Sequence, residues 1–236
     1  MKKIKVLLLS ALLTLSTGSI FAHALWIETA STGRKGQQQT VKVFYGEYAD
    51  NERDSVSKWY SDVKDLTLWI VSPGQEPSKL TLKLGVNHYE ATFTPAIEGT
   101  YVLQVSHEAK ELGGTTKYHF LANAKVNVGK ATISANSTNV LNLSDTYQKP
   151  AKANQVFKLQ ALAQGVPAKG KSVTIFSPNG WSKAVTTDES GALQFTPLWP
   201  GRYVAEISDT DRTPGSHHGK DFKSTWKGST FSFEVL

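Results

Sequence analysis

A histidine lies where an export signal ends. His23 follows Ala22 in the run from Ala22 to Glu28, AHALWIE. If the signal peptidase cuts after Ala22, His23 becomes the first residue of the mature chain, and its free α-amine and imidazole form a two-nitrogen chelate for a divalent metal. A cut after Ala24 also fits the small-x-small rule and would remove the chelate. The sequence leaves both cuts open.

Two further histidines lie at the ends of predicted strands. His107 ends one strand and His119 lies near the start of the next. In an immunoglobulin-like sandwich, the N-terminus lies at the same end as the loop between these strands. We therefore expect a metal site formed by His23, His107 and His119. Nearby carboxylates that could complete it are Glu47, Asp50, Glu108 and Glu111.

A histidine pair forms a second and weaker candidate site. His217 and His218 lie in a glycine-flanked loop, GSHHGKD, and Asp221 adds a carboxylate. Adjacent histidines on such a loop can both reach one metal, although a solvated loop tip is the alternative interpretation. We expect the tightest site at His23, because a chelate within one residue loses little conformational entropy on binding.

The available ligand atoms narrow the choice of metal. The chain has no cysteine, and its single methionine is Met1, which leaves with the signal. Any metal must then be bound by nitrogen and oxygen. This favours divalent Ni, Co, Cu or Zn and disfavours Cu(I).

Residues 1–22 have the three parts of a signal peptide. A positive end with three lysines precedes the apolar run from Val6 to Leu15, and small and polar residues follow up to Ala22. The apolar run is too short for a permanent transmembrane helix, so we expect a periplasmic protein with no membrane span after cleavage.

The formal net charge is +6, of which the three signal lysines contribute half. The remaining Lys and Arg form no cluster, which argues against nucleic acid as a partner.

An internal repeat predicts the fold. Residues 93–106 and 195–208 share the frame F-T-P-x-x-x-G-x-Y-V-x-x-[VI]-S. Apolar residues alternate with polar ones along these and the neighbouring segments, which is typical of strands with one buried face. We predict two tandem immunoglobulin-like antiparallel β-sandwiches, residues 23–130 and 131–236, each packed independently. The Gly before each tyrosine resembles the start of a tyrosine corner.

One segment interrupts the strand pattern. Within the insertion from Gly46 to Asp65, four apolar residues follow helical spacing, which predicts a short helix capped by Asp50 or Asn51. These residues are Val56, Trp59, Tyr60 and Val63. A polar loop with two aromatic residues is the alternative.

Two family resemblances add to these predictions. The run TDESGALQF, followed by LWPGRY, resembles carboxypeptidase-regulatory-like and related immunoglobulin-like modules. The chain as a whole resembles the periplasmic NikM-like family of unknown function, which is associated with nickel uptake. The features are a signal that runs into AHALWIE, a first strand ending near VFYG at residues 43–46, and the second module. The resemblance implies that the signal ends just before His23; Ala24 stands where Asp or Glu is common.

These observations predict a metal-binding protein and not an enzyme. The sequence has no H-E-x-x-H, no G-x-S-x-G and no phosphate-binding glycine loop. We expect an accessory protein of metal uptake or handling, with a membrane metal transporter or another periplasmic protein as partner. The alternatives are a β-sandwich adhesion module without metal affinity and a copper oxygenase with an N-terminal histidine brace.

Overall fold

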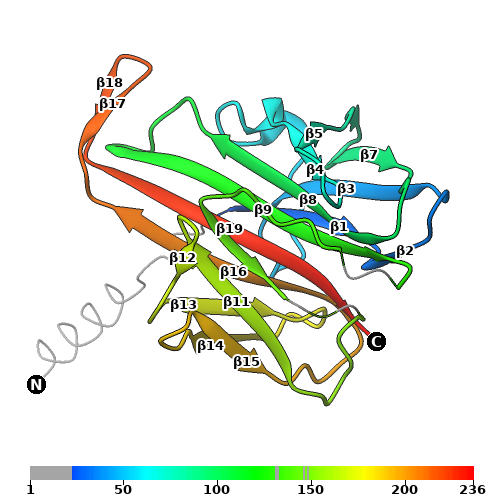
Figure 1. The fold of residues 1–236 in the computed structure, drawn as a ribbon. Coiled ribbons are helices and arrows are strands. Elements are labelled where there is room, and N and C mark those ends of the chain that lie inside the picture. The colour runs from blue at the N-terminus through cyan, green and yellow to red at the C-terminus, as the bar shows by residue number, and fades with distance from the viewer. Residues whose placement is uncertain (1–22, 131–132, 146, 148) are drawn as a thin grey trace, which may run out of the picture.

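The structure, a computed structural model, describes residues 23–236 apart from residues 131–132, 146 and 148. The described chain is all-β, which confirms the predicted fold class, and its sheets pack face to face as in a β-sandwich (Figure 1). No helix in the described ranges is long and apolar enough to span a bilayer.

The strands of the described residues form three sheets and one hairpin. The first small sheet has the order β1 (Ala24–Thr29), β3 (Gln39–Gly46), β7 (Tyr89–Phe93) and β6 (Lys83–Leu84). The second contains β10 (Leu141–Ser144), β11 (Phe157–Ala163), β12 (Val166–Pro167) and β15 (Ala192–Phe195). The hairpin consists of β17 (Gly215–His217) and β18 (Lys220–Phe222) and projects from one end of the molecule in Figure 1.

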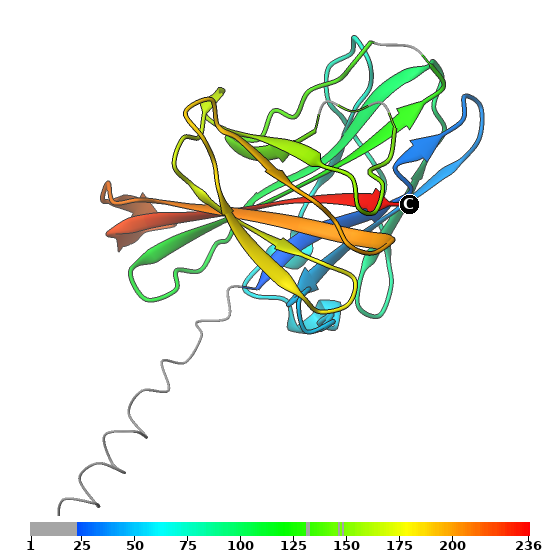
Figure 2. The same cartoon turned by 90° about the horizontal axis from the view of Figure 1, so that it is seen from below.

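The third sheet is large and central. Its strands, in order, are β14 (Ser182–Thr186), β13 (Ser172–Phe176), β16 (Gly201–Asp211), β19 (Ser224–Val235), β9 (Thr116–Val128), β8 (Gly99–Glu108), β4 (Leu68–Val71) and β5 (Ser78–Lys79), with β2 (Thr32–Gly33) paired to the end of β9. Figure 2 shows the long strands β16 and β19 running through the middle of the molecule.

Side-chain alternation places one small sheet on each face of the large sheet. On β9, Phe120 belongs to the first hydrophobic core, whereas its neighbour Leu121 belongs to the second. On β16, Tyr203 lies in the second core, whereas Val204 packs against Trp26 of β1. Because successive side chains of a strand point to opposite faces, the large sheet separates the two cores.

The two halves of the chain share this large sheet. Strand β19 pairs in parallel with β9 from Ser224↔Thr116 to Ser232↔Ala124. Most residues of the first core precede residue 130 and most of the second core follow it, and the hydrogen bonds of the β9–β19 ladder join the two halves. Strand β9 is buried on both faces over most of its length, and nothing in the sequence shows which strand pairs with its second edge.

The first strand is also attached to the last. Strand β1 is an edge of its own sheet, so some of its carbonyl groups lack a ladder partner. The Thr230 hydroxyl donates to the Leu25 carbonyl at 2.6 Å, and the Ser232 hydroxyl donates to the Ile27 carbonyl. These buried bonds fix the start of the described chain against β19.

The repeated frame forms a tyrosine corner in each half. The Tyr101 hydroxyl donates to the Ile97 carbonyl at 2.9 Å, and the Trp199 amide donates to the Tyr203 hydroxyl at 3.2 Å. Gly201 precedes Tyr203 with φ of 129°, and a Cβ there would lie 2.8 Å from Pro178. The glycine and the tyrosine of the repeat, together with Pro178 from outside the repeated frame, are thus parts of one local structure.

The insertion between β3 and β4 contains two 3-10 turns and no α-helix. They are η1 (Val56–Lys58) and η2 (Val63–Asp65). The backbone of Trp59 between them is extended, and its indole nitrogen donates to the Asp54 carbonyl at 3.0 Å. The prediction of a helix capped by Asp50 or Asn51 was therefore wrong: Ser55 and Asp62 precede the turns without side-chain capping bonds. Burial of single aromatic and apolar residues outweighed helical spacing here.

Candidate functional site

Strand register places His23 opposite Glu47. The β1–β3 ladder ends at the pair Ala24↔Gly46, so the next residues on each side are His23 and Glu47. Beyond Gly46 the chain folds back sharply, with φ of 148° at Gly46, where a Cβ would lie 2.4 Å from the Glu52 carbonyl oxygen. The returning chain is held by the Asp54 amide, which donates to the Tyr45 carbonyl at 3.0 Å.

This turn brings two carboxylates to the imidazole of His23. Nδ1 lies 3.4 Å from Oε1 of Glu47, and Nε2 lies 3.3 Å from Oδ2 of Asp54. The ring also contacts Tyr45 at a centroid distance of 5.3 Å, and the side chain is 32% exposed. The imidazole is therefore held between two acids while one part stays open to solvent.

The electrostatics of Glu47 are unusual for a surface acid. Its Oε1 is buried and has no hydrogen-bond partner among the described residues. Burial raises the pKa of Glu47, and the charges of Asp50, Glu52 and Asp54 raise it further, whereas His23 lowers it. Burial and the charge of Glu47 also raise the pKa of Glu206 to about 7. A cation at this place would relieve an unsatisfied and partly desolvated carboxylate.

Arg53 anchors the loop that carries Asp54. Its guanidinium donates to Oε1 of Glu28 at 3.1 Å and lies over the ring of Phe44, 5.0 Å from the centroid. The same Glu28 oxygen accepts a bond from the Trp26 indole at 2.9 Å. The charge-assisted bond to Glu28 and the contact with Phe44 together hold Arg53, the residue before Asp54, against the sheet.

The side chains alone do not form a complete metal centre. Glu47 and Asp54 face different nitrogens of one ring, so they cannot share a metal bound at either nitrogen. Over the described part of the chain, no group of three or more His, Cys, Asp or Glu could hold a metal ion. A third donor beside Nδ1 and Glu47 would have to come from the main chain, and the α-amine of a mature His23 is such a donor.

The other two predicted ligands are not brought to His23. His107 faces the first core, and its Nε2 lies 3.1 Å from Oδ1 of Asp62. His119 points to the opposite face of the sheet, since its neighbour on β9, Phe120, belongs to the first core. Its Nε2 lies 2.8 Å from the Ser106 hydroxyl, and burial lowers its pKa to about 4. The structure thus separates the predicted set of three imidazoles.

The histidine pair lies at the tip of the β17–β18 hairpin. His218 and Gly219 form the turn with φ of 48° and 76°. The Nε2 group of His217 donates to the Ala109 carbonyl at 3.0 Å. In the ladder, His217 pairs with Lys220 and Asp221 pairs with Ser216, so His217 and Asp221 point to opposite faces of the hairpin. The rings of His217 and His218 lie together, with their centroids 4.4 Å apart, whereas Asp221 does not join them on the face of His217.

Comparison with known proteins gives a family but no activity. Residues 20–211 match the family described as "Domain of unknown function (DUF4198)". The chain belongs to this family. No curated protein matches it. Among solved structures, it is similar to an α-2-macroglobulin from Salmonella that was reacted with methylamine, with 11% identity and a TM-score of 0.30. That match covers 90% of this chain but only 15% of the other, and so weak a likeness carries no argument.

Sequence reasoning named Glu47 as a neighbour of His23 but missed Asp54 and Arg53. Glu47 could be found because the loop after the second long strand was expected at the end where His23 lies. Asp54 depends on the fold-back at Gly46, for which the only signal in the sequence is the glycine itself.

Proposed function

We propose that the exported protein binds a divalent transition metal through His23 and Glu47 and serves in metal uptake or handling. The observation that carries the proposal is the pair formed by Nδ1 of His23 and the unpartnered Oε1 of Glu47, 3.4 Å apart. Two donors that bind one metal at about 2.0–2.2 Å each lie roughly 3.0–3.5 Å from one another, so this spacing suits a metal between them.

The donor set needs the mature N-terminus. An α-amine and the Nδ1 of the same histidine close a chelate ring, and Glu47 adds an oxygen on that side of the imidazole. The resulting two nitrogens and one oxygen suit Ni(II), Cu(II), Co(II) or Zn(II). Precursor protein, in which the His23 nitrogen is part of a peptide bond, would lack the chelate.

Asp54 has a separate task in this proposal. With Nδ1 committed to the metal, Nε2 carries the proton and faces Oδ2 of Asp54 at 3.3 Å. A carboxylate that accepts the second ring N–H of a metal-bound histidine fixes the tautomer and the ring orientation. Asp54 thus positions the ligand without binding the metal.

The test is competition titration with Cu(II) and Ni(II) on purified mature protein, after intact mass and N-terminal sequencing have established that it begins at His23. Three proteins are compared: the mature wild type, a variant with one extra Gly before His23, and His217→Ala/His218→Ala.

The extra Gly moves the amine away and should weaken binding about 10-fold or more. The hairpin variant should bind as the wild type does. A mature chain that begins at Leu25, or a larger loss in the hairpin variant, would contradict the proposal. Absence of any metal affinity would favour the adhesion module.

A further inference from the structure

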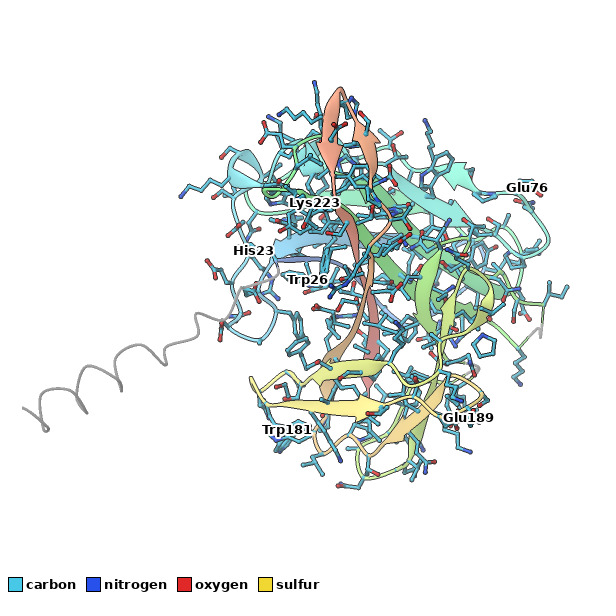
Figure 3. All side chains as sticks on the ribbon, turned by 90° about the vertical axis from the view of Figure 1, so that its left-hand side faces the viewer. His23, Trp26, Glu76, Trp181, Glu189 and Lys223 are labelled. Atoms are coloured by element: carbon cyan, nitrogen blue, oxygen red, sulfur yellow. The ribbon has the colours of Figure 1, made fainter. Side chains whose placement is uncertain are left out.

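A cavity beside His23 is lined by aromatic rings. It has a volume of about 610 Å³. Pockets of about 300–1,000 Å³ are typical for small organic molecules. Its rings are Tyr45, Tyr60, Tyr118, Phe120 and Trp226, and His23 lies at its edge. Figure 3 shows His23 on the same side of the molecule as Lys223, the residue before β19, and Ser224 lines the cavity together with His23.

The rings come from four separate parts of the chain: β3, the insertion, β9 and β19. Tyr45 lies near the end of β3, and Tyr60 belongs to the insertion, between η1 and η2. Tyr118 and Trp226 are directly paired neighbours in the parallel β9–β19 ladder. The cavity therefore depends on the seam between the two halves of the chain.

The rings meet edge to face. Tyr60 and Tyr118 are inclined by 84° at a centroid distance of 5.7 Å, and Tyr118 and Trp226 by 80° at 5.7 Å. Tyr45 and Phe120 are inclined by 80° at 5.6 Å. Rings at such angles do not lie parallel, so the aromatic side chains that line the cavity are set in more than one orientation, and a cation can be attracted by the π face of a ring that it contacts.

Basic side chains are scarce in the wall of the cavity. Among the described residues that line it, His23 is the only basic one, and Lys223 directly precedes the lining residue Ser224. The lysines of the adjoining strands, Lys117 and Lys227, alternate with Tyr118 and Trp226 and so point to the other face of the sheet. At the His23 edge stand the carboxylates of Glu47 and Asp54. The surroundings therefore favour a positive ligand.

We propose that this cavity binds a small organic cation of the quaternary or alkylated ammonium class. The alkylated head lies against the aromatic faces, which attract a cation without requiring hydrogen bonds. Hydroxyl groups at the wall, from Thr210 and Ser224, can bond a polar substituent of the same ligand. This activity is separate from metal binding, because it uses the rings and not the α-amine.

The test uses choline and its uncharged isostere 3,3-dimethyl-1-butanol as probes, measured by calorimetry on mature protein treated with EDTA. The two probes have the same shape and differ in charge, so they separate cation recognition from simple apolar burial. We expect saturable binding of choline at least about 10-fold tighter than that of the alcohol. Equal affinities, or no saturable binding of choline, would overturn the proposal.

Variants locate the site. Tyr60→Leu and Trp226→Leu should each weaken choline binding about 10-fold or more. Trp199→Leu is the matched control, since Trp199 is an exposed aromatic residue of the second half and does not line the cavity. Thermal unfolding identifies variants that fail to fold. Trp226→Phe keeps a ring at that position and should retain most of the affinity.

The Gly-extended protein should bind choline as the wild type does, so failure of this proposal is distinguishable from failure of the metal proposal. Unchanged choline affinity in both folded leucine variants would place the binding elsewhere and contradict the assignment.

Discussion

Nδ1 of His23 and Oε1 of Glu47 lie 3.4 Å apart at the end of a strand ladder, and this buried carboxylate oxygen has no hydrogen-bond partner in the part of the chain that the structure describes. Strand pairing determines this proximity, because the two residues directly follow the last ladder pair. The pair is therefore held by the backbone, and a ligand that binds both groups need not order a flexible loop first.

Removal of the Glu47 charge should weaken metal binding. Glu47→Gln keeps the shape of the side chain and removes the anionic oxygen, so we expect a loss of about 10-fold or more, equivalent to at least about 1.4 kcal/mol. Glu52→Gln is the matched control, because Glu52 is exposed and belongs to the same loop. Its substitution changes the net charge by the same amount as Glu47→Gln. Equal losses in both variants, by competition titration with Ni(II), would mean that Glu47 acts only through the general charge of the loop.

Metal binding should weaken as the pH falls below about 6, because imidazole and amine must be free of protons to coordinate. The raised pKa of Glu47 acts in the same direction, since its carboxyl takes up a proton at a higher pH than an ordinary glutamate. Titrations of metal affinity between pH 5 and pH 8 check this dependence. An affinity that stays constant over this range would exclude these groups as ligands.

His119 should make the protein less stable in mild acid. Burial lowers its pKa to about 4 in the folded chain, against about 6.5 when unfolded. At a pH between these two pKa values, the unfolded chain binds more protons than the folded chain, so the free energy of unfolding rises with pH. The contribution of the neutral His119 to stability is complete above about pH 6.5. It amounts to at most about 3 kcal/mol.

Urea denaturation of the wild type and His119→Gln at several pH values from about 4 to 7 measures this effect. The variant should show a smaller difference in unfolding free energy over that interval. An identical pH dependence in the two proteins would show that other groups cause it. In the wild type, the imidazole resonances of His119 should not titrate above about pH 5 by NMR.

A buried ion pair joins β9 to the segment after β10. Lys125 donates to Oδ1 of Asp145 and, at 2.6 Å, to the Tyr147 carbonyl. Burial lowers the pKa of Lys125 and raises that of Asp145, while each partner opposes the shift of the other. Lys125→Met should lower the free energy of unfolding by about 3–5 kcal/mol, because it leaves Asp145 buried without its counter-charge.

A double-mutant cycle tests this pair. Lys125→Met/Asp145→Asn should be more stable than the sum of the two single variants predicts, because neither charge remains uncompensated. Additive losses in urea denaturation would mean that the two residues do not interact.

The shared sheet predicts one cooperative unfolding transition. Leu121 lies on β9 of the first half, is 1% exposed and packs in the second core. Leu121→Ala should cost about 2–5 kcal/mol and lower the midpoint seen by tryptophan fluorescence and by far-UV circular dichroism equally. The repeat alone predicted two independently packed domains. Two separate transitions, or a stably folded fragment of residues 131–236, would support that earlier expectation against the shared sheet.

Most strands of this protein could be predicted from neighbouring residues, although the helix predicted in the insertion is absent. Alternating apolar residues predicted strands, and the repeated frame predicted the same local unit twice, because these signals depend on neighbours within about a dozen residues. The prediction that loops of the first half gather near His23 also has a structural counterpart: Glu47 and Asp54 lie beside its ring, and Gly113 and Thr116 line the same cavity.

Which side chains come into contact depends on how the strands pair and pack in three dimensions. His119 and Phe120 are neighbours in sequence, yet they point to opposite faces of the sheet, and a change of one residue in register would exchange them. Likewise, the parallel pairing of β9 with β19 joins Tyr118 to Trp226 across more than a hundred residues. The alternation of residues along a strand shows that every second side chain lies on the same face of the sheet. Which face packs against a given core, and which strand pairs with which, depends on packing between segments far apart in the chain.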